Sequence, residues 1–236
     1  SHHRKNLAVI FQNEEDKGLF LKNRIIKEEQ AFMIKGSGVD LNQYCYTPEP
    51  VSGKIKVLLT ARMIVEKGVF VLTNAALKLK VEYKDKVEFL LCGGLDDNPK
   101  AIKEEELKTV CDGEYIQWLG YRTDVLELLK SCHIVAFPSY YKEGLPKSLI
   151  EATAVGRPIV TTNSIGCKET VIDGYNGYLI PIKDSDTLAE RLKILFEDEG
   201  LRQNMGRNSR MLAEKDFSIE NVIQKHLEIY NQLSKA

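Results

Sequence analysis

The sequence lacks the features that mark several large classes of protein. No apolar run is long enough to cross a bilayer, and no signal peptide is visible. The five cysteines are scattered without a C-x-x-C spacing, which argues against a disulfide framework or a zinc site and for a reducing compartment. Lys and Arg total 33 against 34 Asp and Glu, so the basic excess typical of nucleic-acid binding is missing. We therefore expect a cytoplasmic protein without a nucleic-acid partner.

What the sequence does contain is a regular alternation of strand-like and helix-like segments. This alternation requires parallel strands joined by crossovers, and it predicts an α/β fold with a Rossmann-like, doubly wound parallel sheet. Ligands of such sheets bind beyond the carboxyl ends of the strands, so the loops that directly follow strands are the informative ones. We expect strands at 6–11, 31–40, 56–60, 87–93, 115–120, 134–139, 158–162 and 177–182, and helices at 14–28, 69–83, 100–111, 124–132, 148–156, 184–198, 199–214 and 218–233.

Two cations follow the strand expected at 56–60. Arg62 and Lys67 lie in the sequence ARMIVEKG, between the carboxyl end of that strand and the start of the next helix. Two positive side chains beside the positive end of a helix suit a phosphate or diphosphate. Taken by itself, the loop favours the plainer interpretation, a solvated turn that carries two surface charges.

A glycine, a proline and several free amides follow the strand expected at 134–139. Pro146 suits the first turn of the next helix, because its missing N–H would have had no intrahelical partner. Gly144 lets the backbone approach a ligand closely. The amides of Gly144, Leu145 and Lys147 can then donate to an oxyanion or a hydroxyl.

Two glutamates flank this turn in the sequence KEGLPKSLIE (142–151). Glu143 precedes the expected helix and Glu151 lies about one and a half turns inside it, so both can reach one crevice. Carboxylates accept well from the paired hydroxyls of sugars. The plainer interpretations are an acidic residue favoured near a helix start for Glu143 and a surface position for Glu151. The apolar neighbours of Glu151 favour function there, because an unpaired carboxylate among them would be costly.

Three further loops and two histidines give weaker indications. The GSGVD turn (36–40) is a plain turn or lies at the mouth of the crevice, and SIGCKE (164–169) can receive a phosphate or a sugar. The acidic run at 96–98 lacks the spacing of metal ligands, so a polar turn is favoured over a metal site. His133 and His226 are interpreted as structural.

Together these loops resemble those of the family 4 retaining glycosyltransferases, which have the GT-B fold. The two glutamates embedded in EGLP and followed by GRPIV are the most specific part of the resemblance. The rest of the matching sequence is similar to that of bacterial enzymes of lipopolysaccharide, capsule and other lipid-linked glycan synthesis that use UDP-sugars. The matching pieces are GSGVD (36–40), ARMIVEKG (61–68), WLGYRTDVLELLKSCHIVAFPS (118–139), EGLPKSLIEA (143–152), GRPIVTT (156–162) and GCKETVIDGYNGYLIP (167–181).

The resemblance implies a role for each of these residues. Arg62 and Lys67 would hold the donor diphosphate and stabilise the leaving group, and Glu143 would orient the donor sugar, which makes these three the expected catalytic residues. Glu151 would accept hydrogen bonds from the ribose. No metal and no cofactor is implied, since side-chain cations and helix ends supply the positive charge. The other donor-binding residues that we expect are Gly144, Leu145, Gly120, Tyr121, Arg122, Gly36 and Ser37.

The resemblance also divides the chain and limits its expected activity. Most of the acceptor-binding N-terminal domain of a full enzyme would be missing, so we expect the chain to bind a nucleotide sugar and to transfer nothing. The glycan or lipid-linked acceptor would need the missing domain, the last helix would be partly uncovered, and the whole enzyme could associate with the inner face of the cytoplasmic membrane. The expected parts are a tag remnant (1–3), the last β-α-β piece of the N-terminal domain (4–40), a hinge (41–54), the nucleotide-sugar domain (55–214) and a C-terminal helix that packs toward the N-terminal domain (215–236).

Two other functions remain open at this point. A sugar-nucleotide epimerase would share the fold, although the glutamate pair and GCKE fit it less well. A non-catalytic module that binds a dinucleotide is the second alternative. The G-x-G-x-x-G that such a module places after its first strand is missing, and GGLDDN (93–98) lacks the third glycine.

Overall fold

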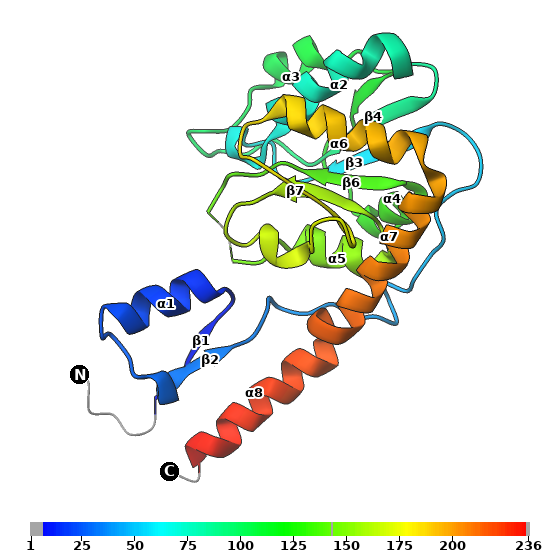
Figure 1. Cartoon of the computed structure of the whole chain (residues 1–236). Helices are drawn as coiled ribbons and strands as arrows, with labels where there is room; N and C mark the ends of the chain where they lie inside the picture. Colours follow the sequence, from blue (N-terminus) through cyan, green and yellow to red (C-terminus); the bar gives the residue numbers. More distant parts are fainter. Residues whose placement is uncertain (1–6, 143, 235–236) are drawn as a thin grey trace.

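Six parallel strands form the main sheet of the protein, in the order β5-β4-β3-β6-β7-β8 (Figure 1). The structure is a computed structural model that describes residues 7–142 and 144–234. The chain runs outward from β3 to β5 and then returns to the other side of β3 with β6, so the expected doubly wound α/β sheet is confirmed. The strands are β3 (Ile55–Thr60), β4 (Val87–Cys92), β5 (Ile116–Trp118), β6 (Ile134–Phe137), β7 (Ile159–Thr162) and β8 (Gly177–Ile180).

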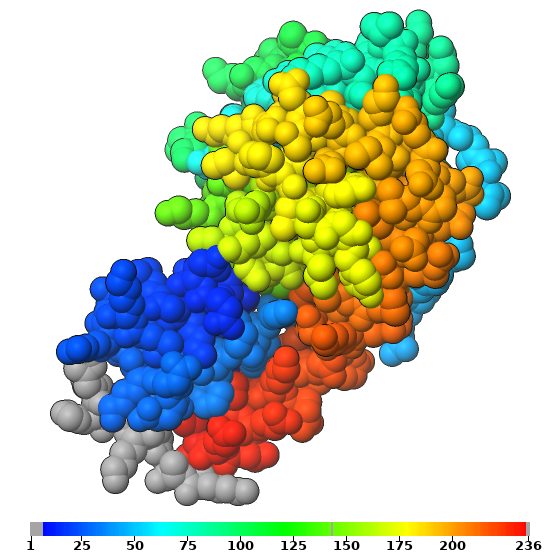
Figure 2. Space-filling view, in the orientation of Figure 1, coloured from blue at the N-terminus to red at the C-terminus, as the bar shows by residue number. Residues whose placement is uncertain are grey.

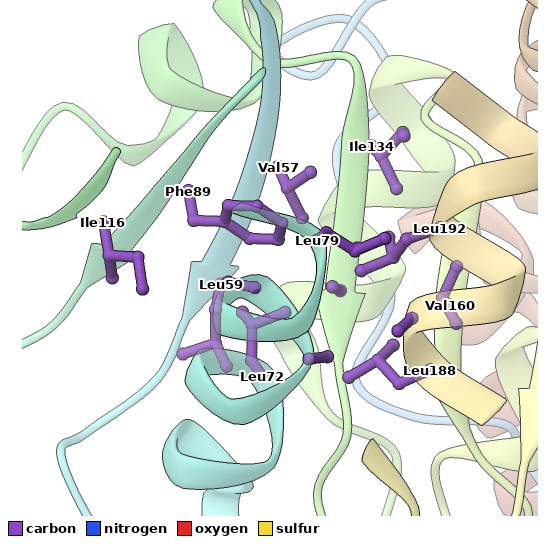
Figure 3. Close-up of a cluster of buried hydrophobic side chains, with 14 of the residues drawn as sticks. Val57, Leu59, Leu72, Leu79, Phe89, Ile116, Ile134, Val160, Leu188 and Leu192 are labelled. Carbon is purple, nitrogen blue, oxygen red and sulfur yellow. The ribbon is translucent and has the colours of Figure 1, made fainter. Parts of the chain in front are cut away.

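Helices cover both faces of this sheet because its strands are apolar on both sides. In β3, Val57 and Leu59 pack into one core cluster with α2 and α6, and Leu58 packs into a second cluster with α4 and α5. Figure 3 shows the first cluster, in which side chains of the strands meet those of α2 and α6. The helices of this domain are α2 (Val69–Tyr83), α3 (Glu104–Val110), α4 (Val125–Ser131), α5 (Lys147–Val155), α6 (Ser185–Glu197) and α7 (Glu199–Leu212).

A smaller unit lies beside the main domain, where the two ends of the described chain meet (Figures 1 and 2). A small apolar cluster of Ile34, Val222 and Ile229 joins this unit to the last helix. That helix also has exposed apolar side chains, among them Leu227 and Tyr230, as expected for a helix that is partly uncovered. The unit consists of β1 (Val9–Phe11), α1 (Glu14–Lys22) and β2 (Ala31–Met33), with β1 and β2 pairing in parallel, and the last helix is α8 (Ile219–Ser234).

Three predicted boundaries were wrong, and in each case a local or tertiary contact explains the difference. The strand expected at 31–40 ends at Met33, because Gly36 and Gly38 take positive φ values of 70° and 78° and turn the chain. The helix expected at 14–28 ends at Lys22, because Asn23 caps it and Arg24 takes a left-handed φ of 53°. The helix expected at 100–111 begins only at Glu104, because Ala101 bridges to Ile64 in the loop after β3.

None of the described helices is long and apolar enough to span a membrane. The helix that follows β6 begins at Lys147. Pro146 occupies its N-cap, one position before the first-turn position expected for it. Gly156 ends this helix in the left-handed conformation (φ 84°), as a C-terminal glycine does. The helix therefore carries Glu151 at its centre, directly behind the loop that leaves β6.

Candidate nucleotide-sugar site

The switch point of the sheet lies between β3 and β6, which are neighbours although β4 and β5 separate them in sequence. In an open α/β sheet this is where ligands bind, in the crevice beyond the strand ends. The loops that leave β3 and β6 are joined by their backbones, since the Glu66 carbonyl accepts hydrogen bonds from the amides of Tyr140 (2.9 Å) and Tyr141 (3.1 Å). The loop after β3 and the loop after β6, which carry the predicted catalytic residues, are therefore held together at the switch point.

Gly68 lies at a close approach between these loops. It ends the turn after β3 with φ of 81°, and a Cβ at this position would overlap the carbonyl oxygen of Pro138. Only glycine combines this backbone conformation with this approach. The glycine thus fixes how the N-terminus of α2 sits against the loop after β6.

Arg62 extends from the end of β3 into solvent, with 57% of its side chain exposed. Its guanidinium forms an ion pair of 2.8 Å with Asp96, from the loop after β4. The pKa of Asp96 lies below its ordinary value, first because the Asn98 amide donates to the carboxylate and then because Arg62 does. Asp96 therefore belongs to an ion pair. Among the described residues, no group of three or more His, Cys, Asp or Glu side chains is able to hold a metal.

Lys67 is buried in the turn before α2, in contrast to Arg62. Its ammonium group lies 4.8 Å from the centre of the Tyr141 ring and 5.7 Å from that of Phe137. Cations are attracted to the faces of aromatic rings at such distances. This places the charge of Lys67 against the loop that leaves β6, at the switch point.

Gly144 and Leu145 meet a residue from the other end of the chain. The amide of Leu145 donates to the Gln12 side-chain oxygen at 3.0 Å, and a Cβ on Gly144 would overlap that oxygen. Gly144 permits a close approach to Gln12 in this structure, and its expected approach to a ligand stays a prediction. Lys147, the third amide of the expected set, opens α5.

Glu151 is buried, with 8% of its surface exposed. Its carboxylate accepts a hydrogen bond from the Tyr44 hydroxyl at 3.0 Å, and the Lys147 ammonium lies 3.8 Å away. Burial raises the pKa of Glu151, while the Tyr44 and Lys147 contacts act in the opposite direction. Burial and the neighbouring carboxylate also raise the pKa of Tyr44 to about 12. The surface interpretation of Glu151 was wrong, because the carboxylate is held inside the fold.

The residues expected beside the base follow β5. Gly120 has φ of 66° and its carbonyl accepts from the Gly93 amide at 2.9 Å, so the ends of β4 and β5 lie together. Tyr121 is 77% exposed. Arg122 forms two hydrogen bonds with Asp124, of 2.7 and 2.6 Å. Asp124 occupies the N-cap position of α4, and its carboxylate binds Arg122 instead of a backbone amide of the helix.

Gly36 and Ser37 reach the same region from the N-terminal unit. A Cβ on Gly36 would come within 2.6 Å of Ile150 and 3.3 Å of Leu145, so this turn packs against the start of α5. Ser37 is exposed beside it. Glu143 lies outside the described residues, and its expected role stays a prediction.

Sequence analysis missed two contacts of these site residues. Tyr44 lies in the segment expected to be a hinge, and nothing in its local pattern indicates a partner in α5. Gln12 is a polar residue that directly follows β1, and the rule that strand ends carry function would have indicated it. Among the predicted residues, the structure brings the turn at Lys67 to the loop at Tyr141, and Gly36 to Leu145. Arg62 instead pairs with Asp96, and Glu151 pairs with Tyr44. No hydrogen bond or ion pair joins Arg62 to Glu151 among the described residues.

Similarity to known proteins agrees with this arrangement. The family model for glycosyl transferases group 1 matches residues 48–211. An N,N'-diacetylbacillosaminyl-diphospho-undecaprenol alpha-1,3-N-acetylgalactosaminyltransferase of Campylobacter jejuni is 35% identical over 96% of this chain and 60% of its own length. The capsular polysaccharide biosynthesis glycosyltransferase CapM of Staphylococcus aureus is 27% identical over 96% of this chain and 62% of its own. The chain thus spans about three fifths of these relatives.

Solved structures share the fold over nearly the whole chain. A glycosyltransferase from Rickettsia africae superposes with a TM-score of 0.86 at 24% identity, covering 98% of this chain and 64% of that one. Anabaena HepE, solved in complex with UDP-glucose, superposes with a TM-score of 0.80 at 23% identity, covering 100% of this chain and 65% of that one.

Proposed function

Because the chain belongs to the glycosyl transferases of group 1, we propose that it is the donor-binding part of a retaining, family 4 enzyme. The enzyme would transfer a hexose or an N-acetylhexosamine from a UDP-sugar to a lipid-linked or polysaccharide acceptor. The observation that carries this proposal is the switch point, where the cationic loop after β3 is joined to the loop after β6 and to the helix that buries Glu151.

The proposed roles are those that the family resemblance implies, and the charges and positions of the residues support them. Arg62 and Lys67 stabilise the diphosphate as negative charge develops on the leaving group. The Gly144 amide donates to an oxygen of the donor, and Glu151 accepts from the ribose hydroxyls in place of the Tyr44 hydroxyl. Glu143 would orient the donor sugar, on the family resemblance. The charge of the two cations suits a mechanism without a metal.

The similarity to the Campylobacter enzyme supports an N-acetylhexosamine donor and a lipid-linked acceptor. That relative is named an N-acetylgalactosaminyltransferase acting on an undecaprenol diphosphate, and HepE supports UDP as the nucleotide through its fold and its complex with UDP-glucose. We propose that the acceptor is held by the part of the relatives' length that this chain does not span. The chain alone would then bind the donor and transfer no sugar.

Isothermal titration of the chain with UDP, UDP-N-acetylgalactosamine, UDP-galactose, GDP and NAD tests the proposal. We expect binding of UDP and of at least one UDP-sugar, with GDP weaker and NAD absent. Tight NAD binding without UDP binding would indicate a dinucleotide module instead. Release of UDP or epimerisation of the sugar without an acceptor would favour the epimerase alternative.

A further inference from the structure

Gln12 connects the small N-terminal unit to the main domain at the candidate site. It directly follows β1, and its side-chain oxygen accepts the hydrogen bond of the Leu145 amide at 3.0 Å. The two residues are 133 positions apart in sequence. This contact therefore joins the end of one parallel sheet to the loop at the switch point of the other.

The residues on either side of Gln12 are fixed in place. Phe11 is buried, and its carbonyl accepts from the Ile34 amide at 2.9 Å. Asn13 is 2% exposed and caps α1, accepting from the Asp16 amide at 2.8 Å and donating to the Asp16 carboxylate at 2.8 Å. Gln12 itself is exposed. A polar side chain thus projects toward the Leu145 loop from a rigid backbone.

The contact also uses the space left by the glycine at position 144. A Cβ there would overlap the Gln12 side-chain oxygen, whereas the backbone of Gly144 does not have the positive φ that would require glycine. The missing side chain therefore leaves room for the approach of Gln12.

A groove lies beside this contact, between α1 and the loops after β6 and β7. Its volume is about 510 Å³, and an ion pair between Glu15 and Lys168 also links α1 to the loop after β7. Both units contribute to its walls, which combine charged, apolar and backbone surfaces. The lining residues are Glu15, Asp16, Leu19, Lys142, Gly144 and Ile165.

We propose that Gln12 positions the sugar of the donor in this groove. Its oxygen holds the Leu145 loop, and its nitrogen, which has no hydrogen-bond partner among the described residues, donates to a hydroxyl or an acetamido oxygen of the sugar. A carboxamide serves both purposes because it carries an acceptor and two donors on one planar group. This inference rests on the proposed function and adds a residue from the N-terminal unit to the donor site.

Two substitutions separate the two roles of the carboxamide. Gln12→Ala removes both, and Gln12→Glu keeps an acceptor for the Leu145 amide but has no N–H to donate. The ratio of the Kd of UDP to that of UDP-N-acetylgalactosamine measures the contribution of the sugar. We expect this ratio to fall roughly 3- to 10-fold in both variants, the value of one hydrogen bond. Gln224→Ala, an exposed glutamine on α8, should leave it unchanged.

Amide hydrogen exchange of Leu145, measured by NMR without nucleotide, is the second readout. Protection should be lost in Gln12→Ala and kept in Gln12→Glu. An unchanged affinity ratio in either variant, while the wild type binds UDP-sugar better than UDP, would overturn the role of Gln12 alone. A wild-type chain that binds neither UDP nor a UDP-sugar would overturn the proposed function itself.

Discussion

The two sides of the switch point hold their charges in different ways. On the β3 side, Lys67 is buried, but Arg62 is mostly exposed and paired with Asp96. On the β6 side, Glu151 is buried, and burial raises its pKa. An exposed cation costs the fold little and is screened by solvent, whereas a buried carboxylate costs stability. The comparison shows that Glu151 gives stronger structural evidence for function than Arg62 does, because the fold retains an expensive group there.

Substitution of Gly68 should disrupt the packing between the loop after β3 and the loop after β6. Gly68→Ala should lower the free energy of unfolding by more than about 3 kcal/mol, because a left-handed backbone and an overlap with the Pro138 carbonyl add together. Chemical denaturation at pH 7 measures the loss. Gly113→Ala is the matched control, since its φ is 80° and nothing lies within 4 Å of the added Cβ. Its cost should be about 1–2 kcal/mol, and equal losses at the two positions would mean that the approach to Pro138 is unimportant.

The cationic side is tested by Arg62→Ala. Loss of a charge-assisted hydrogen bond to the diphosphate should cost about 1.5–3 kcal/mol, or roughly 10- to 100-fold in the Kd of UDP. Uridine, which carries no phosphate, should bind as before. Titration calorimetry at constant ionic strength compares the two ligands. Arg207→Ala removes an exposed cation of α7 as a control, and an equal weakening of UDP and uridine by Arg62→Ala would contradict the diphosphate role.

The sequence predicted the positions of these site residues but only some of their contacts. Strand positions and the strand-end rule located Arg62, Lys67 and the turn at Gly144, because two-residue alternation and buried apolar runs are local properties. The pairing of Tyr44 with Glu151 spans 107 residues and was not predictable from any local pattern. Tertiary contacts of this kind decide which side chain a functional residue meets, and they also set helix boundaries such as that of α3.

The buried side is tested by Glu151→Gln, which removes the charge and keeps an oxygen for Tyr44. Because the folded-state pKa of Glu151 is raised, its ionisation reduces stability as the pH rises through that pKa. The variant should therefore have the higher Tm at pH 7, and the difference should vanish below the ordinary carboxyl pKa of 4.5. At the same time its affinity for UDP should fall, since a neutral acceptor binds the ribose more weakly.

Glu197→Gln provides the matched control for this pH profile. Glu197 also accepts from a tyrosine, Tyr83, at 2.6 Å, but 56% of its side chain is exposed. Its substitution should change the Tm little between pH 4 and 7. A Glu151→Gln variant that loses stability at pH 7, or that binds UDP as the wild type does, would mean that the buried carboxylate is a structural group.

The smallest expected effect concerns the partner of Arg62. Asp96→Asn removes the carboxylate that holds the guanidinium at 2.8 Å and leaves Arg62 free to meet an incoming diphosphate. Exposed ion pairs are weak, so UDP affinity should rise only roughly two- to fivefold, and less at high salt. Asp97→Asn removes an equal charge from the neighbouring exposed position. If both variants raise the affinity for UDP equally, the gain comes from net charge alone. A gain confined to Asp96→Asn means that the ion pair competes with the nucleotide for Arg62.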